Sequence, residues 1–249
     1  MNRIRIPDTI KHLIILNVIF YIGMMMTPAL YDMLAIWFPK NDNFKVWQIF
    51  SHMFMHSPKF LPHILFNMLA LWMFGSPLEQ MWGKKKFLFF YFSSGLGAVF
   101  LPWAIDFYQF NSILETLNSS GYTADYVIDI LNQEKYNIDW KNILSEDTFN
   151  KFNSIFYANG VGASGAIMGL IAAFGLSFPN AKMALIFLPV PIAAKYFIPV
   201  LLAYETLSGI FGGTSILGVN VAHFAHVGGA LTGGLIALYW KKTQFKHYN

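Results

Sequence analysis

Long apolar runs separated by polar connections are the feature that most constrains how this chain can fold. Six such runs cover approximately residues 12–30, 61–82, 87–105, 161–178, 183–211 and 219–240. As helices rising about 1.5 Å per residue, they are long enough to cross a hydrocarbon core about 30 Å thick. Charged residues make up only 12% of the sequence, about half the share in a soluble domain. The sequence therefore predicts an all-α membrane protein, in which six transmembrane helices form one domain over residues 1–249.

The fifth apolar run is the least regular, because Pro189, Pro191 and Pro199 interrupt it. Proline removes a backbone donor and clashes with the preceding turn of a helix. We therefore expect the first part of this run to lie at the membrane interface and its spanning helix to begin near Lys195.

Basic residues gather in the connections that share one side of the membrane if the six runs alternate in direction. They are Arg3, Arg5, Lys11, Lys84, Lys85, Lys86, Lys182, Lys241, Lys242 and Lys246. The positive-inside rule assigns this side, and with it both termini, to the cytoplasm. Lysines beside apolar segments are topology signals, so we expect no nucleic-acid partner. The chain has no segment resembling a transit peptide, which favours a bacterial plasma membrane.

Two long connections are then expected on the outer side. Residues 31–60 are amphipathic and rich in aromatic side chains, which is typical of a segment lying at the membrane interface. Residues 106–160 are acidic and polar, with short apolar stretches such as 126–131. They predict a small helical excursion, and their acidity independently favours the same orientation.

The residue types present argue against metal and cofactor chemistry. The chain has no cysteine, which excludes disulfides, thiolate nucleophiles and cysteine-based metal sites. Histidines cluster at His52, His56 and His63, and again at His223 and His226. Imidazole binds zinc, but no acidic residue neighbours either cluster in sequence and no His-Glu-x-x-His motif occurs. We therefore expect no metal, and we assign His52, His56 and His223 to packing or to the interface.

A serine among small residues opens the fourth apolar run, in the sequence Gly162-Ala163-Ser164-Gly165. Such a serine can act as a nucleophile, because the glycines let other backbone approach and leave room for a substrate. The alternative is a purely structural role. Gly165 and Gly169, four residues apart, would also form a small face for helix packing.

A nucleophilic serine needs a base, and histidine is the commonest one. His226 lies in the sixth run and shares a helix face with Gly229 and Gly233. That face has almost no side-chain bulk, so it predicts close packing against the small face of the fourth run. Such packing would bring His226 toward Ser164, in a common layer in the outer half of the membrane.

Glu205 is the only carboxylate well inside the fourth to sixth runs. No carboxylate is positioned by the sequence to orient His226, so a Ser-His dyad is favoured over a triad. Glu205 itself is interpreted as a buried polar contact within the fifth helix.

His63 and Asn67 reach the same layer from the second run, at a spacing of four residues on one helix face. A tetrahedral intermediate needs hydrogen-bond donors for its oxyanion, and both side chains can supply them. The alternative is again structural: Asn67 would bond to a neighbouring helix, and His63 would cap its own.

Together these residues resemble the rhomboid intramembrane serine proteases. The matching segments are Gly-x-Ser-Gly at 162–165, Ala-His-x-x-Gly-x-x-x-Gly at 225–233, His-x-x-x-Asn at 63–67, and the stretch from Trp47 to Gly75 with Glu79 beyond it. The resemblance covers about residues 45–104 and 157–240. It implies a six-helix rhomboid fold that cleaves transmembrane helices of other membrane proteins.

The resemblance also implies roles for individual residues. Ser164 would attack the peptide carbonyl and His226 would shuttle the proton, while His63, Asn67 and the backbone N–H of Ser164 would hold the oxyanion. Gly162 would help to position the substrate. The family often carries an aromatic residue four positions after the serine; here it is Met168, whose thioether can still contact an imidazole.

Two other functions remain open from the sequence. A non-catalytic rhomboid-like protein would bind membrane helices for quality control or trafficking, but inactive relatives typically lose the serine or the histidine, and this chain keeps both. A small transporter is the second alternative, and the absence of paired intramembrane charges or an inverted repeat argues against it. Neither the natural substrate nor the oligomeric state follows from the sequence.

Overall fold

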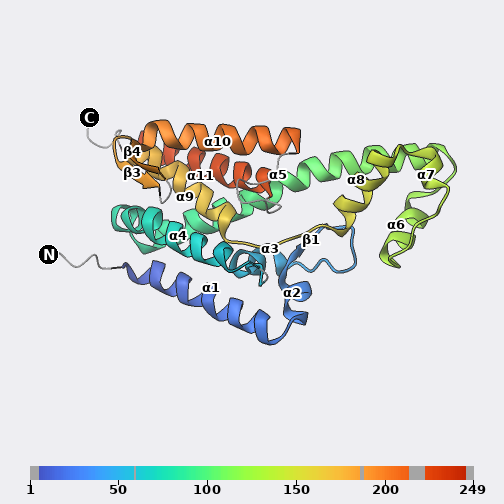
Figure 1. Cartoon of the computed structure of the whole chain (residues 1–249), viewed down its shortest axis with the longest axis horizontal. Helices are drawn as coiled ribbons and strands as arrows, with labels where there is room; N and C mark the ends of the chain where they lie inside the picture. The colour runs from blue at the N-terminus through green and yellow to red at the C-terminus, as the bar shows by residue number, and fades with distance from the viewer. Residues whose placement is uncertain (1–5, 59, 186–187, 213–221, 245–249) are drawn as a thin grey trace.

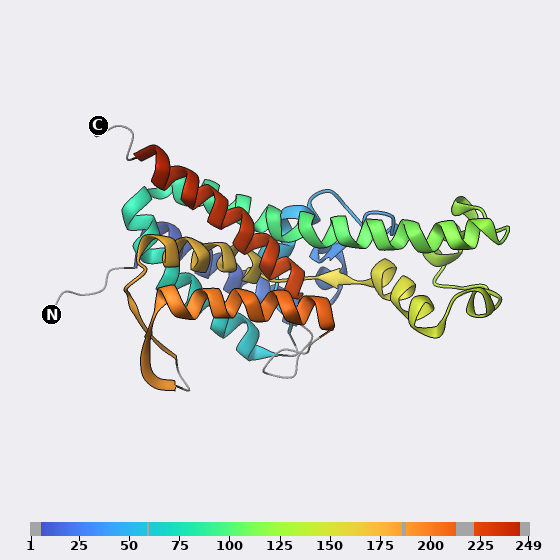
Figure 2. The ribbon, with the colours of Figure 1, turned by 90° about the horizontal axis from the view of Figure 1, so that it is seen from above.

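A computed structural model describes residues 6–58, 60–185, 188–212 and 222–244. Its main part is a bundle of long helices lying side by side, from which a helical excursion projects at one end (Figures 1 and 2). The bundle helices are α1 (Asp8–Met26), α4 (Leu61–Trp82), α5 (Lys84–Ser119), α9 (Ser164–Ser177), α10 (Ala194–Phe211) and α11 (His223–Gln244). A mostly helical fold is thus confirmed.

The helix boundaries refine the expected spans. The second run coincides with α4, but the third continues without a break to Ser119, well past residue 105. The fourth helix begins only at Ser164, three residues later than expected. Residues 219–221 of the sixth run lie outside the described residues.

Three of the described helices, α1, α4 and α5, are long and apolar enough to cross a membrane by length and composition, and α9 is a shorter apolar helix. Many apolar side chains on these helices face outward, among them Ile19 and Met25 of α1. Such exposure is expected where lipid and not water surrounds the protein. The count of six spans stays a prediction.

The fifth run contains a strand pair as well as a helix, which the all-α prediction missed. β3 (Lys182–Leu185) pairs antiparallel with β4 (Leu188–Ala193), and α10 follows at Ala194. The prolines at 189 and 191 fall in β4, where a missing backbone donor is tolerated at the edge of a two-stranded sheet. The helix expected to span the membrane, α10, therefore begins one residue from the expected Lys195.

The centre of the bundle is α9, which packs against α4, α5, α10 and α11. Glycines make this possible. A Cβ on Gly229 of α11 would overlap the backbone of Gly165, and a Cβ on Gly233 would lie 2.6 Å from Cα of Gly169. The predicted contact between the small faces of the fourth and sixth runs is confirmed.

The first connection folds over one end of the bundle. It contains α2 (Ala29–Leu34), β1 (Ile36–Trp37), α3 (Gln48–Ser51) and the 3-10 helix η1 (His52–Phe54). The fully buried side chain of Gln48 holds this segment together, because its amide donates to the carbonyl oxygens of Asn43 and Met33, at 2.9 and 3.3 Å.

The excursion has its own apolar cluster, as the helical prediction for residues 106–160 requires. The excursion consists of the outer half of α5 together with α6 (Ala124–Asn132), α7 (Trp140–Ile143) and α8 (Glu146–Tyr157). Phe110 stacks on Phe152, with ring centroids 4.7 Å apart, and Trp140 is fully buried beside them. A short strand, β2 (Asn159–Gly160), pairs with β1 and leads the chain back to α9.

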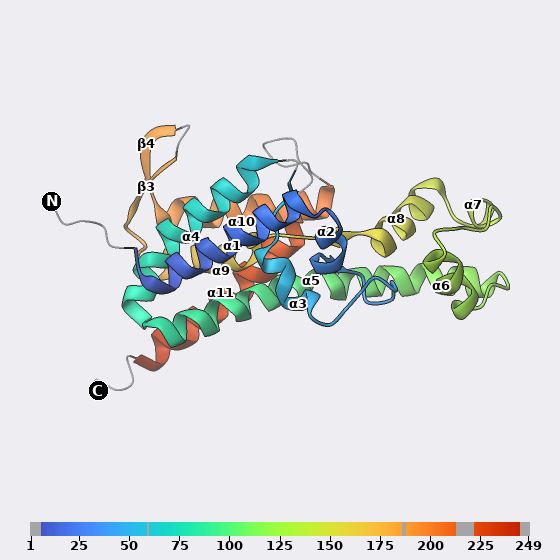
Figure 3. The ribbon, with the colours of Figure 1, turned by 90° about the horizontal axis from the view of Figure 1, so that it is seen from below.

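Lysines from separate parts of the chain gather at one end of the bundle. The beginning of α1, the turn between α4 and α5, the β3–β4 hairpin and the end of α11 all lie at one end, opposite the excursion (Figures 1 and 3). The lysines of the α4–α5 turn and of the α11 end are therefore brought to the same side of the molecule.

Candidate active site

Ser164 is the first residue of α9, and an unusual backbone conformation leads into it. Gly162 has φ of +135°, which L side chains rarely adopt, and its N–H donates to the carbonyl oxygen of His52 at 2.9 Å. The bond ties the approach to α9 to the first connection. Ser164 is thereby placed at the end of a helix, where its hydroxyl has open space beside it.

Ser164 and His226 meet across the packed helices. The hydroxyl oxygen of Ser164 lies 2.9 Å from Nε2 of His226. This is hydrogen-bond distance, as required of a nucleophile and its base. The contact follows from the glycine packing of α9 on α11, since Gly165 is adjacent to Ser164 and Gly229 is three residues beyond His226.

His63 lies near Ser164, beside Gly162. A side chain at Gly162 would place its Cβ 3.2 Å from Nε2 of His63 and 3.5 Å from Oγ of Ser164. Nδ1 of His63 accepts a hydrogen bond from the backbone N–H of Ser57 at 3.3 Å, so in the neutral ring Nε2 carries the proton. A donor therefore faces the space that the missing side chain of Gly162 leaves open beside Ser164.

Asn67 is buried one turn further along α4, and its amide donates to the carbonyl oxygen of His63 at 2.8 Å. Asn67 therefore lies on the expected face of α4. Its hydrogen-bond partner is in its own helix, whereas the structural alternative expected a bond to a neighbouring helix. Its second amide hydrogen is not used in this bond.

The position of Glu205 departs from the expectation that no carboxylate lies where it could orient His226. Its Oε2 lies 3.1 Å from Nδ1 of His226 and 2.7 Å from Nδ1 of His223. The sequence contained a signal for this arrangement: two histidines at a spacing of three share a helix face, and Glu205 is the only carboxylate within the neighbouring spans. The rotation of α10 that turns Glu205 toward them could not be read from it.

A cleft of about 190 Å³ opens above Ser164. Its walls come from β1, β2, α5 and the beginning of α9, and they include Trp37, Val99, Trp103 and Asp106. Burial raises the pKa of the Asp106 carboxyl to about 6, and the nearby positive charge of Lys151 opposes this shift. The cleft is mainly apolar and leads from the excursion to the hydroxyl of Ser164.

The remaining predicted residues have packing positions. Met168 is buried in the central apolar cluster, one turn beyond Ser164, so its contact with the imidazole stays a prediction. His52 and His56 are buried outside the spans, and burial lowers their pKa values to about 4 and about 3. In the described part of the chain, no group of three or more His, Asp or Glu side chains could hold a metal ion.

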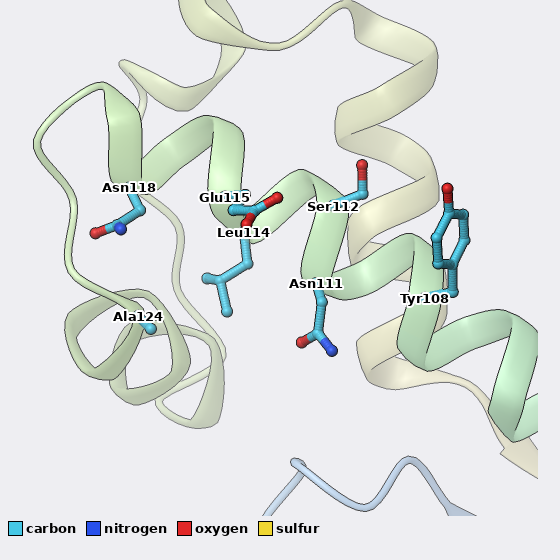
Figure 4. Close-up of a pocket in the computed structure, with 7 residues that line it drawn as sticks. All are labelled: Tyr108, Asn111, Ser112, Leu114, Glu115, Asn118 and Ala124. Atoms are coloured by element: carbon cyan, nitrogen blue, oxygen red, sulfur yellow. The ribbon is translucent and has the colours of Figure 1, made fainter.

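A larger cavity, of about 480 Å³, lies in the excursion between the outer half of α5 and the start of α6 (Figure 4). Its lining includes Tyr108, Asn111, Ser112 and Glu115 but no histidine. Ser112 therefore has no imidazole base there, and the pairing of a serine with a histidine singles out the cleft above Ser164.

Comparison with known proteins agrees with this geometry. The family model described as the Rhomboid domain matches residues 43–127 and 138–243. This chain belongs to the rhomboid family. It is accordingly an integral membrane protein, and the sequence resemblance is confirmed.

Individual relatives of this rhomboid are distant. It is 29% identical over 202 residues to rhomboid protease AarA of Providencia stuartii, covering 77% of this chain and 55% of the relative. It is 26% identical over 228 residues to rhomboid protease GlpG of Yersinia pestis, covering 91% and 60%. Rhomboid protein 1, mitochondrial, of Saccharomyces cerevisiae is 26% identical over 181 residues, covering 72% and 38%. The chain thus spans about half the length of the curated relatives it matches.

Proposed function

We propose that this rhomboid is an intramembrane serine endopeptidase that cleaves the transmembrane helices of single-span membrane proteins near their outer ends. The observation that carries the proposal is the 2.9 Å separation of Ser164 Oγ and His226 Nε2, beside a cleft that Ser164 helps to line. Relatives named as rhomboid proteases, AarA and GlpG, support the same activity.

The proposed reaction is acyl transfer in two steps. Nε2 of His226 takes the hydroxyl proton as Ser164 attacks the peptide carbonyl carbon, and then gives it to the leaving amine. Water, activated by the same imidazole, hydrolyses the resulting acyl-enzyme. Nε2–H of His63, the second amide hydrogen of Asn67 and the backbone N–H of Ser164 donate to the oxyanion.

The position of the site suggests where a substrate is cut. A transmembrane helix hides its peptide bonds behind side chains and internal hydrogen bonds, so it must unwind locally before Ser164 can attack. Ser164 is the first residue of α9, which begins on the excursion side of the bundle, whereas the turn between α4 and α5 lies at the opposite end (Figure 1). With the lysines of that turn in the cytoplasm, cleavage falls near the outer end of the substrate. The resemblance to rhomboid proteases implies a small residue at the cut, and the need to unwind favours helix-weakening Gly or Pro after it.

The arrangement also suggests one rhomboid membrane domain over residues 1–249. The connection at 31–60 lies at the outer interface, and the acidic excursion at 106–160 lies outside. Both termini are cytoplasmic, and the membrane is a bacterial plasma membrane. Lipid and membrane-protein substrates are the proposed partners.

A direct test incubates the purified protein in detergent with a single-span membrane protein that carries Ala followed by Gly or Pro near its outer end. Wild type should produce two fragments and Ser164→Ala none, with the cut located by mass spectrometry. Cleavage in the cytoplasmic half would contradict the depth assignment. Unchanged rates after replacing the Gly or Pro by Leu would contradict the unwinding step.

A serine-directed fluorophosphonate separates this function from non-catalytic binding of membrane helices. The proposal expects rapid covalent labelling of Ser164 in wild type and only a small residual labelling rate in His226→Ala, because the hydroxyl needs its base. An unlabelled wild-type serine, together with intact substrate, would favour the non-catalytic alternative.

A further inference from the structure

We infer that Glu205 is a positioning residue for His226, so that Ser164, His226 and Glu205 act together as a triad. The inference rests on the proposed function, since it concerns the base of the same reaction. Oε2 of Glu205 lies 3.1 Å from Nδ1 of His226, while Nε2 of that ring lies 2.9 Å from Ser164 Oγ. The imidazole is therefore held between a carboxylate and the nucleophile.

The two ring nitrogens of a base must have different roles. Nε2 of His226 can accept the proton of Ser164 only if the proton of the neutral ring is on Nδ1. A carboxylate beside Nδ1 favours this tautomer, because ionised Glu accepts hydrogen bonds and cannot donate them. The same charge stabilises the imidazolium that forms when Ser164 is deprotonated.

Nothing else in the described structure performs this task. Nδ1 of His226 is buried, and among the described residues it has no aligned hydrogen-bond partner. Glu205 is within ion-pair distance but not yet in hydrogen-bond alignment. Catalytic hydrogen bonds are often poorly aligned before substrate binds and tighten in the complex, so a small rotation of the ring or carboxylate completes the contact.

The burial of Glu205 is also explained by this role. Its side chain is 9% exposed on α10, a helix of the membrane bundle. An intramembrane carboxylate is costly and typically has a functional partner. Glu205 has two imidazole neighbours on α11, His223 at 2.7 Å and His226 at 3.1 Å. The competing explanation is that Glu205 only fastens α10 to α11 through His223.

Matched variants separate these explanations. Glu205→Gln keeps the size of the side chain but removes its charge, and it should lower kcat by at least about tenfold, toward the 10⁴-fold loss typical when a triad carboxylate becomes an amide. KM should be unchanged, because the contact acts on the base and not on the substrate. His223→Gln, which keeps a donor for Glu205, should leave kcat within about threefold of wild type.

Two results would overturn the inference while leaving the proposed protease intact: a loss of less than tenfold in Glu205→Gln, or equal losses in Glu205→Gln and His223→Gln. Wild type that neither cleaves nor labels would instead overturn the proposed function. Labelling of Ser164 by the fluorophosphonate gives a third comparison. In a His226→Ala background, Glu205→Gln should reduce the residual labelling rate no further, because the two residues act as a unit.

A spectroscopic measurement tests the same inference without turnover and without depending on a folded Glu205 variant. In wild type with ¹⁵N-labelled histidine, the His226 signals can be assigned by their loss in His226→Gln. At a pH where the ring is neutral, we expect the proton on Nδ1. A proton on Nε2 in the neutral ring would overturn the inference whatever the kinetics show.

Discussion

Gly229 of α11 packs directly on the backbone of Gly165 of α9, so closely that no side-chain atom fits between them. Ser164 adjoins one of these glycines, and His226 is three residues from the other. The distance between the two helices therefore sets the distance between the proposed nucleophile and its base.

Enlarging Gly229 should consequently separate this pair. A Cβ there would overlap the carbonyl oxygen of Gly165, and backbone cannot move aside as a flexible side chain can. We expect Gly229→Ala to lower the thermal unfolding midpoint and to reduce cleavage by at least about tenfold, because sub-ångström positioning controls rate. Gly234→Ala is the matched control, since no atom of another described segment lies within 4 Å of a Cβ built there. Equal behaviour of the two variants would contradict the packing argument.

Ser164→Ala and His226→Ala should each abolish cleavage, and the double variant should be no worse than either single one. Residues that act as a unit have strongly non-additive effects. The measurement is the single-turnover rate on a fixed transmembrane substrate, with circular dichroism to verify folding. Substantial activity in either single variant would remove the Ser-His mechanism.

His63→Ala and Asn67→Ala should leave weak but measurable activity. Loss of one oxyanion donor typically costs about 10²–10³ in turnover. The two variants test different points, because Nε2 of His63 borders the open space at Gly162 beside Ser164, whereas the amide of Asn67 bonds to the carbonyl oxygen of His63. Wild-type kcat in Asn67→Ala would restrict that residue to a structural role, and wild-type kcat in His63→Ala would exclude it from the oxyanion site.

The proposed topology can be measured in a background that needs no preparation, because the chain contains no cysteine. Single cysteines at Asn118, near the end of α5, and at Thr243, near the end of α11, should react with an impermeant thiol reagent from opposite sides of the membrane. The excess of lysines at the α11 end predicts that residue 243 is cytoplasmic. Labelling of both positions from one side would contradict the six-span arrangement.

The buried histidines of the first connection predict loss of stability in acid. Burial lowers the pKa of His52 to about 4 and that of His56 to about 3, so below the usual value of 6.5 the unfolded chain binds protons that the folded one does not. The free energy of unfolding should therefore fall as pH drops from 6.5 toward 4. Thermal midpoints of His56→Phe should fall less steeply over that range, since the variant has one such group fewer.

Asp106 should change the free energy of unfolding with pH in the opposite direction. Its pKa is raised to about 6, so between pH 6 and its unfolded value the folded chain binds the additional proton and gains stability as pH falls. Asp106→Asn should remove this gain and make the acid loss of stability steeper than in wild type. A free energy of unfolding of Asp106→Asn that does not change between pH 7 and pH 4 would contradict the assigned burial of His52 and His56.

Much of the candidate site followed from local patterns in the sequence. Gly165 with Gly169 and Gly229 with Gly233 lie on small helix faces whatever surrounds them, because a helix has 3.6 residues per turn. Two such faces pack closely, and Ser164 and His226 follow from that packing. The apolar runs likewise predicted the bundle, since uncharged stretches of this length are most stable in a hydrocarbon core.

Only the tertiary structure decided the rotation of α10, the length of α5 and the pairing of strands that lie far apart in the sequence. Hydropathy indicates that a helix spans a membrane, but its rotation depends on neighbouring helices, so the turn of Glu205 toward His226 had no signature within the fifth run. The extension of α5 to Ser119 depends on the apolar cluster that α6 to α8 build against it. The pairing of β1 with β2 joins residues more than a hundred positions apart. Such contacts form only when the whole chain is packed, and no local pattern encodes them.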